Sequence, residues 1–392
     1  MLSAQAAATV RATLTAIGGS IGEITPLFYR RLFAAHPELA RDLFNRGNQA
    51  DGSQQQALAG SIVAFATVLL ERPEERPDAM LARIAHKHAS LGVRPEQYPV
   101  VREHLFAAIV EVLGEAVTPE VAAAWDEVYW LMANALIAIE ARLCQEAGVP
   151  VGEVWREYRV VGRRAETAEV VTFEVEPADG GPAPAHRPGQ YVSVQVELAD
   201  GARQIRQYSL SGASADTLRF TVKRDGEVSR HLYERVPVGA AVRVSLPFGD
   251  VHLDGADDAP VLLVSAGIGC TPMIGILSHL VEGDSKRRVI AAHADRSPAD
   301  HAFRAELGRL TAALPNGEAH VWYERPESAE WPADRTGLID LSALVVPPGT
   351  TAYLCGPLPF LRFTRSQLID AGLPASAIHY EVFGPDLWLA RA

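Results

Sequence analysis

The sequence has few cysteines, no long apolar run and no excess of positive charge. Its three cysteines, Cys144, Cys270 and Cys355, lie far apart, so they form neither a zinc-finger spacing nor the four-thiolate set of an ordinary iron–sulfur cluster. No stretch approaches the roughly 18 apolar residues of a membrane span. The first residues lack a basic segment ahead of an apolar one, so we expect no signal peptide. Sparse, odd-numbered cysteines fit a reducing compartment, and we therefore expect a cytoplasmic protein.

The charge balance of the chain is acidic. Its 36 Lys and Arg residues stand against 48 Asp and Glu residues, a net charge of −12 over 392 residues. Such a surface repels phosphate backbones, which argues against a nucleic-acid partner, although a local basic cluster can still hold a nucleotide. Hydrophobic residues make up 48% and charged residues 21% of the chain, which is an ordinary globular composition. The length predicts a multidomain protein, and we expect it to act as a monomer.

The spacing of apolar residues changes twice along the chain. Residues 1–147 repeat apolar positions three and four apart, which predicts helices separated by turn signals such as His36-Pro37. Residues 148–258 alternate with period two between Gly-, Pro- and Asp-rich connections, which predicts a small antiparallel β-barrel. In residues 259–392 strands alternate with helices, as in a doubly wound parallel sheet. The expected order is therefore an all-α domain, a β-barrel and an α/β domain.

Two histidines, His86 and His88, lie on one predicted helix. Residues two apart point roughly 200° apart around a helix, so one site cannot use both. His88 shares an apolar stripe with Leu81, Ile84 and Leu91. A histidine on such a stripe is more often a satisfied core residue than a ligand, but His88 is the candidate metal ligand of the chain.

Other residues of the helical region support a ligand role for this histidine. Gln54 begins an apolar helix face that includes Leu58, Tyr29 lies in an aromatic helix, and Phe44 follows a proline break. Together with His88 they resemble the globin family, in which a Phe stands at the corner after the third helix. The resemblance implies a b-type haem with His88 as proximal ligand, Gln54 as distal residue and Tyr29 as donor to the bound ligand. Taken alone, Tyr29 is equally well a core aromatic residue.

Two further polar residues are placed to contact His88. Glu140 falls on an apolar stripe of the last predicted helix of this region, where a buried carboxylate needs a partner. Flavohaemoglobins carry Lys-His followed by Pro-Glu-Gln-Tyr, and the chain resembles them at Lys87-His88 and Pro95–Tyr98. The resemblance implies that Glu140 and Tyr98 hydrogen-bond the proximal histidine and make it a stronger electron donor. The other interpretation of Glu140 is a solvated residue at a helix end.

The most specific signal is a pair of motifs, Arg187–Tyr191 (Arg-Pro-Gly-Gln-Tyr) and Arg206-Gln207-Tyr208-Ser209. The pair resembles the flavin domains of ferredoxin–NADP⁺ reductase-like proteins. The resemblance implies bound FAD, with Arg206 on the pyrophosphate, Tyr208 on the isoalloxazine and Ser209 near its reactive nitrogen; Tyr191 and Gln207 belong to the same site. An arginine suits phosphate because its planar fork binds two oxygens. Downstream, Gly226-Glu227-Val228-Ser229 opens a predicted helix whose free N–H groups can take phosphate.

The last region carries a nucleotide-type loop. Gly267-Ile268-Gly269-Cys270-Thr271-Pro272 follows an apolar strand and precedes a helix, which is the context that a dinucleotide motif requires. The resemblance assigns this loop and Cys355-Gly356-Pro357 to the nicotinamide nucleotide, and Glu381-Val382-Phe383-Gly384-Pro385 to the flavin side. Val382 stands where the family often has a Cys or a small residue, and the tail Leu387–Ala392 is longer than the family's. We interpret Cys270 and Cys355 as small buried residues beside turns rather than as a thiol switch.

The order of the three regions resembles a flavohaemoglobin along nearly the whole chain. The resemblance implies that NAD(P)H gives a hydride to FAD, that FAD passes single electrons to the haem iron, and that O₂ held under Tyr29 and Gln54 reacts with NO to give nitrate. The chain would then be a nitric oxide dioxygenase. Two alternatives stay open: a general haem or flavin reductase acting on peroxides or other acceptors, and an O₂ carrier or sensor with a built-in reductase. The choice between NADH and NADPH is also open, with Arg296 as a candidate for a 2′-phosphate.

Overall fold

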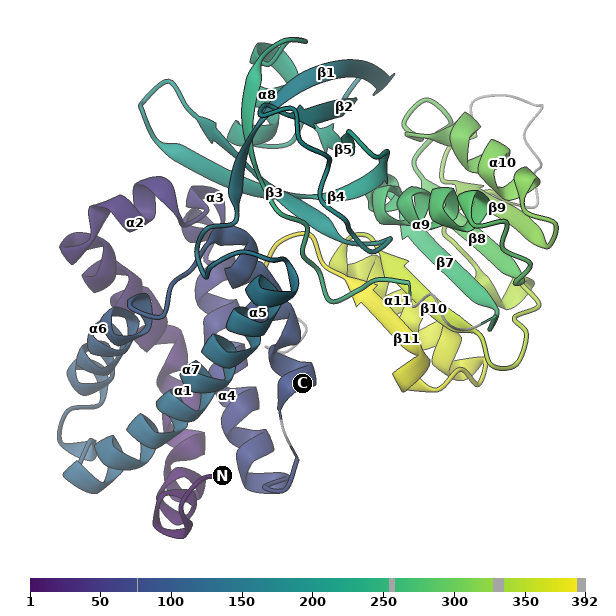
Figure 1. The fold of residues 1–392 in the computed structure, drawn as a ribbon. Helices are drawn as coiled ribbons and strands as arrows, with labels where there is room; N and C mark the ends of the chain where they lie inside the picture. The colour runs from purple at the N-terminus through teal and green to yellow at the C-terminus, as the bar shows by residue number, and fades with distance from the viewer. Residues whose placement is uncertain (76, 254–257, 327–334, 386–392) are drawn as a thin grey trace. The chain divides into compact units, whose positions relative to one another are not determined.

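The structure is a computed structural model that describes residues 1–75, 77–253, 258–326 and 335–385 (Figure 1). Contacts within the chain divide it into two compact units. The first unit comprises Met1–Trp155, Glu197–Arg206 and Gly384–Ala392, and the second comprises Arg156–Val196 and Gln207–Phe383.

The first unit is helical, as the spacing of apolar residues predicts. Its helices begin and end at local signals: the Ser3 side chain caps the first helix, Thr118 caps the last one, and Gly92 ends the fifth in a left-handed conformation. The helices are α1 (Ala4–Ala35), α2 (Pro37–Asp42), α3 (Arg46–Ala50), α4 (Ser53–Glu71), α5 (Asp78–Leu91), α6 (Gln97–Leu113) and α7 (Pro119–Glu146), with a 3₁₀ turn, η1 (Gly114–Ala116), after α6.

Helix α1 is a single 32-residue element that continues through Pro26. A proline inside a helix removes one hydrogen bond, but Ile24, Phe28 and Leu32 are buried on both sides of it, and their burial holds the helix together. Phe44 therefore follows the second helix of this chain, whereas the corresponding Phe of the globin family follows the third. Ile62 of α4 packs against both apolar clusters of this unit, one around Phe28 and one around Phe65.

Six antiparallel strands close into a barrel in the order β1-β2-β5-β4-β3-β6. Phe173 and Phe220 stack inside it with ring centroids 5.5 Å apart. Period-two alternation predicts four of the strands, over Val170–Val175, Tyr191–Val196, Leu218–Lys223 and Ala241–Leu246. It leaves β1 and β4 unassigned. The elements are β1 (Trp155–Thr167), β2 (Val170–Pro177), β3 (Tyr191–Glu197), β4 (Arg203–Ala213), β5 (Leu218–Lys223), α8 (Glu227–Arg235) and β6 (Ala241–Ser245).

The last region is a five-stranded parallel sheet in the order β11-β10-β7-β8-β9. The strand order reverses direction at β7, and ligands of such sheets bind beyond the carboxyl ends of the strands at this point. The elements are β7 (Val261–Ala266), η2 (Gly267–Gly269), α9 (Cys270–Glu282), β8 (Val289–Asp295), α10 (Arg304–Ala313), β9 (Gly317–Tyr323), η4 (Leu341–Ala343), β10 (Thr351–Cys355), α11 (Leu358–Asp370), η5 (Ala375–Ala377) and β11 (Ile378–Glu381).

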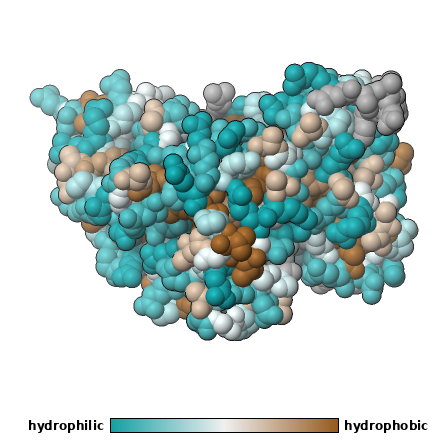
Figure 2. All heavy atoms as spheres, turned by 90° about the horizontal axis from the view of Figure 1, so that it is seen from above, coloured by the Kyte–Doolittle hydropathy of each residue, from teal (hydrophilic) through white to brown (hydrophobic). Residues whose placement is uncertain are grey.

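The structure confirms the predicted order of an all-α region, an antiparallel barrel and a parallel α/β sheet. Helix α9 packs on β7, α10 on β9 and α11 on β10. Hydrophilic residues cover much of the face drawn in Figure 2. Among the helices of the described residues, none is both long enough and apolar enough to cross a membrane.

Candidate functional site

Helices α5, α6 and α7 bring His88, Tyr98 and Glu140 together. Oε1 of Glu140 lies 2.9 Å from Nδ1 of His88 and accepts a hydrogen bond of 2.6 Å from the Tyr98 hydroxyl. The same hydroxyl oxygen lies 3.1 Å from Nδ1. Glu140 is 1% exposed, so the interpretation as a solvated helix-end residue is wrong.

This arrangement fixes the protonation of the imidazole ring. A carboxylate only accepts hydrogen bonds, so Nδ1 of His88 carries a proton and donates a hydrogen bond to Glu140. That leaves Nε2 as the nitrogen that can bind a metal, and the carboxylate makes it more basic. The His88 side chain keeps 31% of its surface exposed, although its neighbours Ala85 and Ala89 on α5 are buried.

The phenol of Tyr98 stays protonated in this environment. Burial raises the pKa of Tyr98 far above its usual value, and the adjacent negative charge of Glu140 raises it further. Its hydroxyl is therefore a permanent donor to the carboxylate. Tyr129 of α7 donates to the Tyr98 carbonyl oxygen at 2.6 Å and holds the first turn of α6 in place. The sequence interpretation missed Tyr129, whose signal is its position one turn after Trp125 on the same helix.

A second polar group lies around Tyr29 on α1. Its ring contacts Phe44 edge-on, with centroids 5.7 Å apart. Burial raises the pKa of Tyr29 well above its usual value, whereas the side-chain amides of Gln54 and Gln49 act on its hydroxyl in the opposite direction. Gln49 is a residue that the sequence interpretation missed, although it stands in the polar turn that precedes Gln54. Its Oε1 accepts a hydrogen bond of 3.2 Å from Gln55.

The residues of the first unit fit a haem. The imidazole of His88 has its Nδ1 hydrogen-bonded to Glu140, which leaves Nε2 to bind a metal. This is the state of a proximal ligand. Apolar side chains in both clusters remain only partly buried, as expected of residues that line a site for a flat apolar group. They include the predicted Phe44 and Leu58, and also Ile62 and Ile84. Lys87, the residue before His88 on α5, is half-buried.

Strand β4 carries the flavin motif Arg206-Gln207-Tyr208-Ser209. The hydroxyl of Ser209 is buried and has no hydrogen-bond partner among the described residues. A buried polar atom without a partner points to a ligand, and the flavin edge implied by the resemblance would supply one. Gln207 donates to Ser193 Oγ at 3.1 Å, and the Tyr208 ring stacks on Phe220 with centroids 5.6 Å apart.

The other flavin motif, Arg187–Tyr191, depends on close backbone packing. Gly189 has φ +106°, and a Cβ there would lie 2.7 Å from the carbonyl oxygen of Val251, so only glycine fits. Tyr191 follows at the start of β3 and exchanges two backbone hydrogen bonds with Phe248. Arg206 donates from Nη1 to the carbonyl oxygen of Ile205 at 2.8 Å.

Helix α8 begins directly after Gly226, a residue without a side chain that could cap the first N–H groups of the helix. Those groups can therefore take a phosphate, as the motif predicts. The hydroxyl of Ser229 forms hydrogen bonds with the backbone of the turn before the helix. It accepts from the backbone N–H of Asp225 at 2.9 Å and donates to the Gly226 carbonyl at 3.3 Å, so it closes the turn that presents the helix end.

The two nucleotide turns touch each other. A Cβ on Gly269 would overlap the carbonyl oxygen of Cys355, and Gly267 has φ +53°, so the glycines allow this approach. The Thr271 hydroxyl donates to the Ile268 carbonyl at 3.0 Å. The residue before α9 is Gly269, which has no side chain to cap the first turn of that helix, and Pro272 lies in the same turn. The second turn continues through Gly356 and Pro357 into α11.

All three cysteines lie in the part of the chain that the structure describes, where they are buried and form no disulfide. Burial raises the pKa of the Cys270 thiol well above its usual value. Because the thiolate is the reactive form, such a thiol is inert. These observations favour the interpretation of Cys270 as a small packing residue rather than part of a switch.

Family models match both ends of the chain. The model described as Globin matches residues 27–136, and the model described as Oxidoreductase NAD-binding domain matches residues 263–366. A flavohemoprotein of Rhizobium meliloti (strain 1021) is 38% identical over 407 residues, which cover 99% of this chain and 100% of that protein. A flavohemoprotein of Bordetella parapertussis is 42% identical over 400 residues, covering 98% of this chain and 99% of that protein. The chain belongs to the flavohemoprotein family.

Solved structures agree with this assignment. A flavohemoglobin from Malassezia yamatoensis with bound FAD and heme matches with a TM-score of 0.91 at 38% identity, covering 98% of this chain and 100% of that one. The flavohem-like FAD/NAD binding domain of nitric oxide dioxygenase from Vibrio cholerae O1 biovar El Tor matches with a TM-score of 0.55 at 36% identity. It covers 59% of this chain and 100% of that one.

The C-terminal motif of this flavohemoprotein follows β11. Glu381 ends the strand and is buried, Val382 is half-buried, and Phe383 is 46% exposed. Gly384 has φ +125°, and Pro385 follows it as the last described residue. An exposed phenyl ring at this position is compatible with a flavin contact. The tail Leu387–Ala392 lies outside the described residues.

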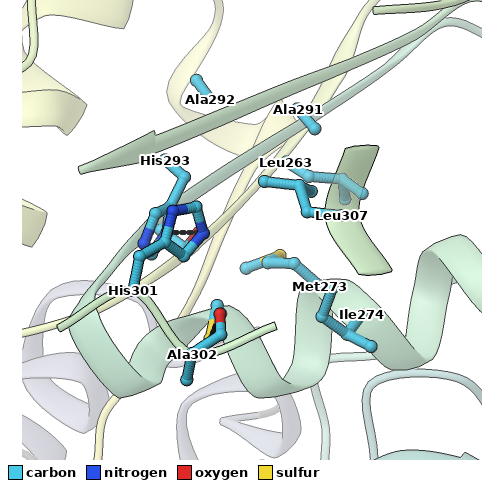
Figure 3. A pocket seen from close by; sticks show the side chains of 11 residues that line it. Leu263, Met273, Ile274, Ala291, Ala292, His293, His301, Ala302 and Leu307 are labelled. Atoms are coloured by element: carbon cyan, nitrogen blue, oxygen red, sulfur yellow. Dashed lines mark hydrogen bonds between the residues drawn. The ribbon is translucent and has the colours of Figure 1, made fainter. Parts of the chain in front are cut away.

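Two buried histidines, His293 and His301, line a small cavity in the α/β region of this flavohemoprotein (Figure 3). The rings of His293 and His301 stack 4.0 Å apart. Nδ1 of His293 lies 2.9 Å from Ser265 Oγ, and Nδ1 of His301 lies 2.8 Å from the Tyr323 hydroxyl. The cavity beside them measures about 10 Å³, room for about one water molecule, so it is not a cofactor site. The sequence interpretation missed this pair.

Proposed function

We propose that this flavohemoprotein is a nitric oxide dioxygenase that uses NAD(P)H to convert NO and O₂ to nitrate. The observation that carries the proposal is the hydrogen bond from His88 to the buried carboxylate of Glu140. A passive oxygen carrier needs only a neutral histidine that holds iron. A proximal histidine with a carboxylate on Nδ1–H pushes electron density towards the metal, which suits an enzyme that activates oxygen. The likeness to the domain described as part of a nitric oxide dioxygenase adds support.

Each residue of the haem region has a distinct task. His88 would hold the iron through Nε2, while Glu140 and Tyr98 keep its ring oriented and its Nδ1 protonated. Tyr29, with Gln54 beside its hydroxyl, would present an O–H donor to the substrate. When bound, haem and FAD supply the redox chemistry that the side chains cannot. The remaining residues of the proposed haem site are Phe44, Leu58 and Lys87.

The flavin and nucleotide sites follow from the barrel and the sheet. Arg206 would hold the FAD pyrophosphate and the Ser209 hydroxyl would contact the flavin edge. The other proposed flavin residues are Tyr191, Gln207, Tyr208, Gly226, Ser229, Glu381, Val382, Phe383, Gly384 and Pro385. The proposed nicotinamide nucleotide residues are Gly267, Ile268, Gly269, Cys270, Thr271, Pro272, Cys355, Gly356 and Pro357.

The organisation of the chain completes the proposal. We assign residues 1–147 to the haem domain, 148–258 to the FAD domain and 259–392 to the NAD(P) domain. Helix α7 ends at Glu146 and β7 begins at Val261, which supports both boundaries. The three cysteines form no disulfide in the described structure, which supports a reducing, cytoplasmic location, and we expect a monomer.

Electron counting gives the test of this function. Forming nitrate from NO and O₂ takes up one electron, whereas a nicotinamide delivers two, so one NAD(P)H should be oxidised for every two NO molecules consumed. The measurement follows NO, NAD(P)H and nitrate together in air-saturated buffer. Oxidation of NAD(P)H that yields only peroxide would point to the general reductase, and NO consumption that stops after one turnover would point to the oxygen carrier.

A further inference from the structure

A buried glutamine near the start of β4 bridges two helix ends. Gln204 is 0% exposed and belongs to the first unit together with α2 and α3. Its Nε2 donates to the carbonyl oxygens of Arg41 at 3.0 Å and Phe44 at 3.2 Å. Its Oε1 accepts from the backbone N–H of Arg46 at 3.2 Å. One side-chain amide therefore spans the whole turn that carries Phe44.

These bonds satisfy groups that the short helices leave open. The last carbonyls and the first N–H groups of a helix have no partner within it. The Asn45 side chain accepts from the N–H groups of Gly47 and Asn48, so it does not serve Arg46. Gln204 completes the turn because it supplies the donor that α2 needs and the acceptor that α3 needs.

Two ion pairs flank the glutamine. Arg203 lies 2.7 Å from Asp42, and Arg46 lies 2.7 Å from Asp200. The guanidinium groups of Arg41 and Arg203 hold the pKa of Asp42 well below its usual range. The Arg46–Asp200 pair is exposed, and such pairs contribute little. The buried amide is the contact that the turn depends on.

The same glutamine also contacts the arginine of the flavin motif. Nη1 of Arg206 lies 3.5 Å from Oε1 of Gln204. On the other side of the turn, the Phe44 ring packs against Tyr29. A continuous series of contacts therefore runs from Arg206 through Gln204 and Phe44 to Tyr29.

We propose that Gln204 is a positioning residue that couples flavin binding at Arg206 to the order of the turn around Phe44. The proposal rests on the proposed flavin site. When a pyrophosphate draws the N–H groups of Arg206 away, Oε1 of Gln204 loses that donor and its bond with the N–H of Arg46 strengthens. Flavin binding then holds the turn more firmly. By linkage, an ordered turn favours the flavin-bound state to the same degree.

Hydrogen exchange of backbone amides tests this coupling in the haem-loaded full chain with and without FAD. In the wild type, FAD should slow exchange of the Arg46 amide by up to about tenfold, because its existing bond to Gln204 strengthens by no more than the net contribution of one hydrogen bond. Gln204→Met keeps the volume but not the hydrogen bonds, so exchange should be fast whether or not FAD is bound. Asp200→Asn, which removes only the exposed ion pair, should behave as the wild type. Amides of α7 serve as the internal reference.

The outcomes separate this proposal from the proposed function. Equal exchange of Arg46 in wild type with and without bound FAD overturns the coupling, and so does FAD-dependent slowing that persists in Gln204→Met. A wild-type chain that binds no FAD overturns the flavin site itself. The infrared stretch of CO bound to the reduced wild type gives a second test without any variant. It should shift on FAD binding because Tyr29 is in contact with the turn, and an unchanged band contradicts the coupling.

Discussion

Glu140 on α7 and His88 on α5 are joined by a hydrogen bond of 2.9 Å between Oε1 and Nδ1. The carboxylate is buried, and the Tyr98 hydroxyl donates to the same oxygen. A hydrogen bond to a buried charge is strong, and leaving that charge without a partner is costly. The ring orientation of His88 is therefore set before any metal binds.

Glu140→Gln should retain haem and FAD but weaken the electron push of His88. The amide carries no charge, so the ferric state loses stabilisation and the haem reduction potential should rise. Substitutions of this kind cost about 10–100-fold in activity, and we expect NO-dependent NAD(P)H oxidation to slow by at least the lower figure. Redox titration and steady-state NO consumption measure the two effects.

The control for this variant is Glu146→Gln, an exposed carboxylate at the end of the same helix. It should leave both the potential and the rate unchanged. Wild-type values in Glu140→Gln would show that the carboxylate does not tune the proximal histidine.

His88→Ala should abolish stable haem binding, while His86→Ala should retain it. The two side chains leave α5 roughly 200° apart, and His88 is the one held by Glu140. Haem content of the purified variants, from absorption spectra, gives the answer. Comparable haem loss in both variants would mean that the ligand is assigned to the wrong face of the helix.

Tyr29→Phe should leave both cofactors in place and speed up oxygen dissociation. The variant removes one hydroxyl and keeps the ring contacts with Phe33 and Phe44. Loss of one net hydrogen bond of about 1 kcal/mol corresponds to roughly a five- to tenfold faster rate. Stopped-flow displacement of oxygen measures it, and an unchanged rate would reduce Tyr29 to a packing residue.

The buried histidine pair predicts acid sensitivity of the α/β sheet. Burial, followed by electrostatic repulsion from His293 and Arg304, lowers the pKa of His301 from 6.5 to about 2. Below pH 6.5 the unfolded chain therefore takes up a proton that the folded chain refuses, so the free energy of unfolding falls as the pH falls. Above that pH His301 is neutral in both states and contributes no pH dependence.

Denaturant unfolding between about pH 7.5 and about pH 5 tests this acid sensitivity. His301→Gln should flatten the pH dependence, because glutamine does not titrate and can still bond the Tyr323 hydroxyl. The exposed His379 on β11 provides the matched control, since His379→Gln also removes one titratable ring and should keep the wild-type slope. A slope that is equal in all three proteins would exclude His301 as its source.

Much of the fold and several site residues follow from local patterns in the sequence. Helix ends are predictable because Ser3, Thr118 and Gly92 act on their own neighbours along the chain. The His88 stripe and the motif of Arg206–Ser209 are likewise local. Glu140 could be placed because a carboxylate among apolar helix positions demands a partner.

Long-range polar contacts were not predictable in the same way. Nothing near Gln204 in the sequence shows that its amide completes a turn of the first helices, because the partners come from a distant segment. Gln49 was missed since its importance depends on where Tyr29 lies. The sequence assigns Gly226–Ser229 to a phosphate-binding helix start, but it does not show that the Ser229 hydroxyl closes the turn before α8, because that depends on backbone geometry.

We propose that one chain passes electrons from NAD(P)H through a flavin to an iron held by His88, for use in NO conversion. Anaerobic mixing of the holoprotein with NAD(P)H, followed by O₂ and then NO in a stopped-flow instrument, follows these steps in order. The flavin should bleach before the haem is reduced, and the haem should return to the ferric form with nitrate as product when NO is added. Haem that stays ferric after the flavin is reduced would exclude this electron route, and NO addition without nitrate would exclude this product.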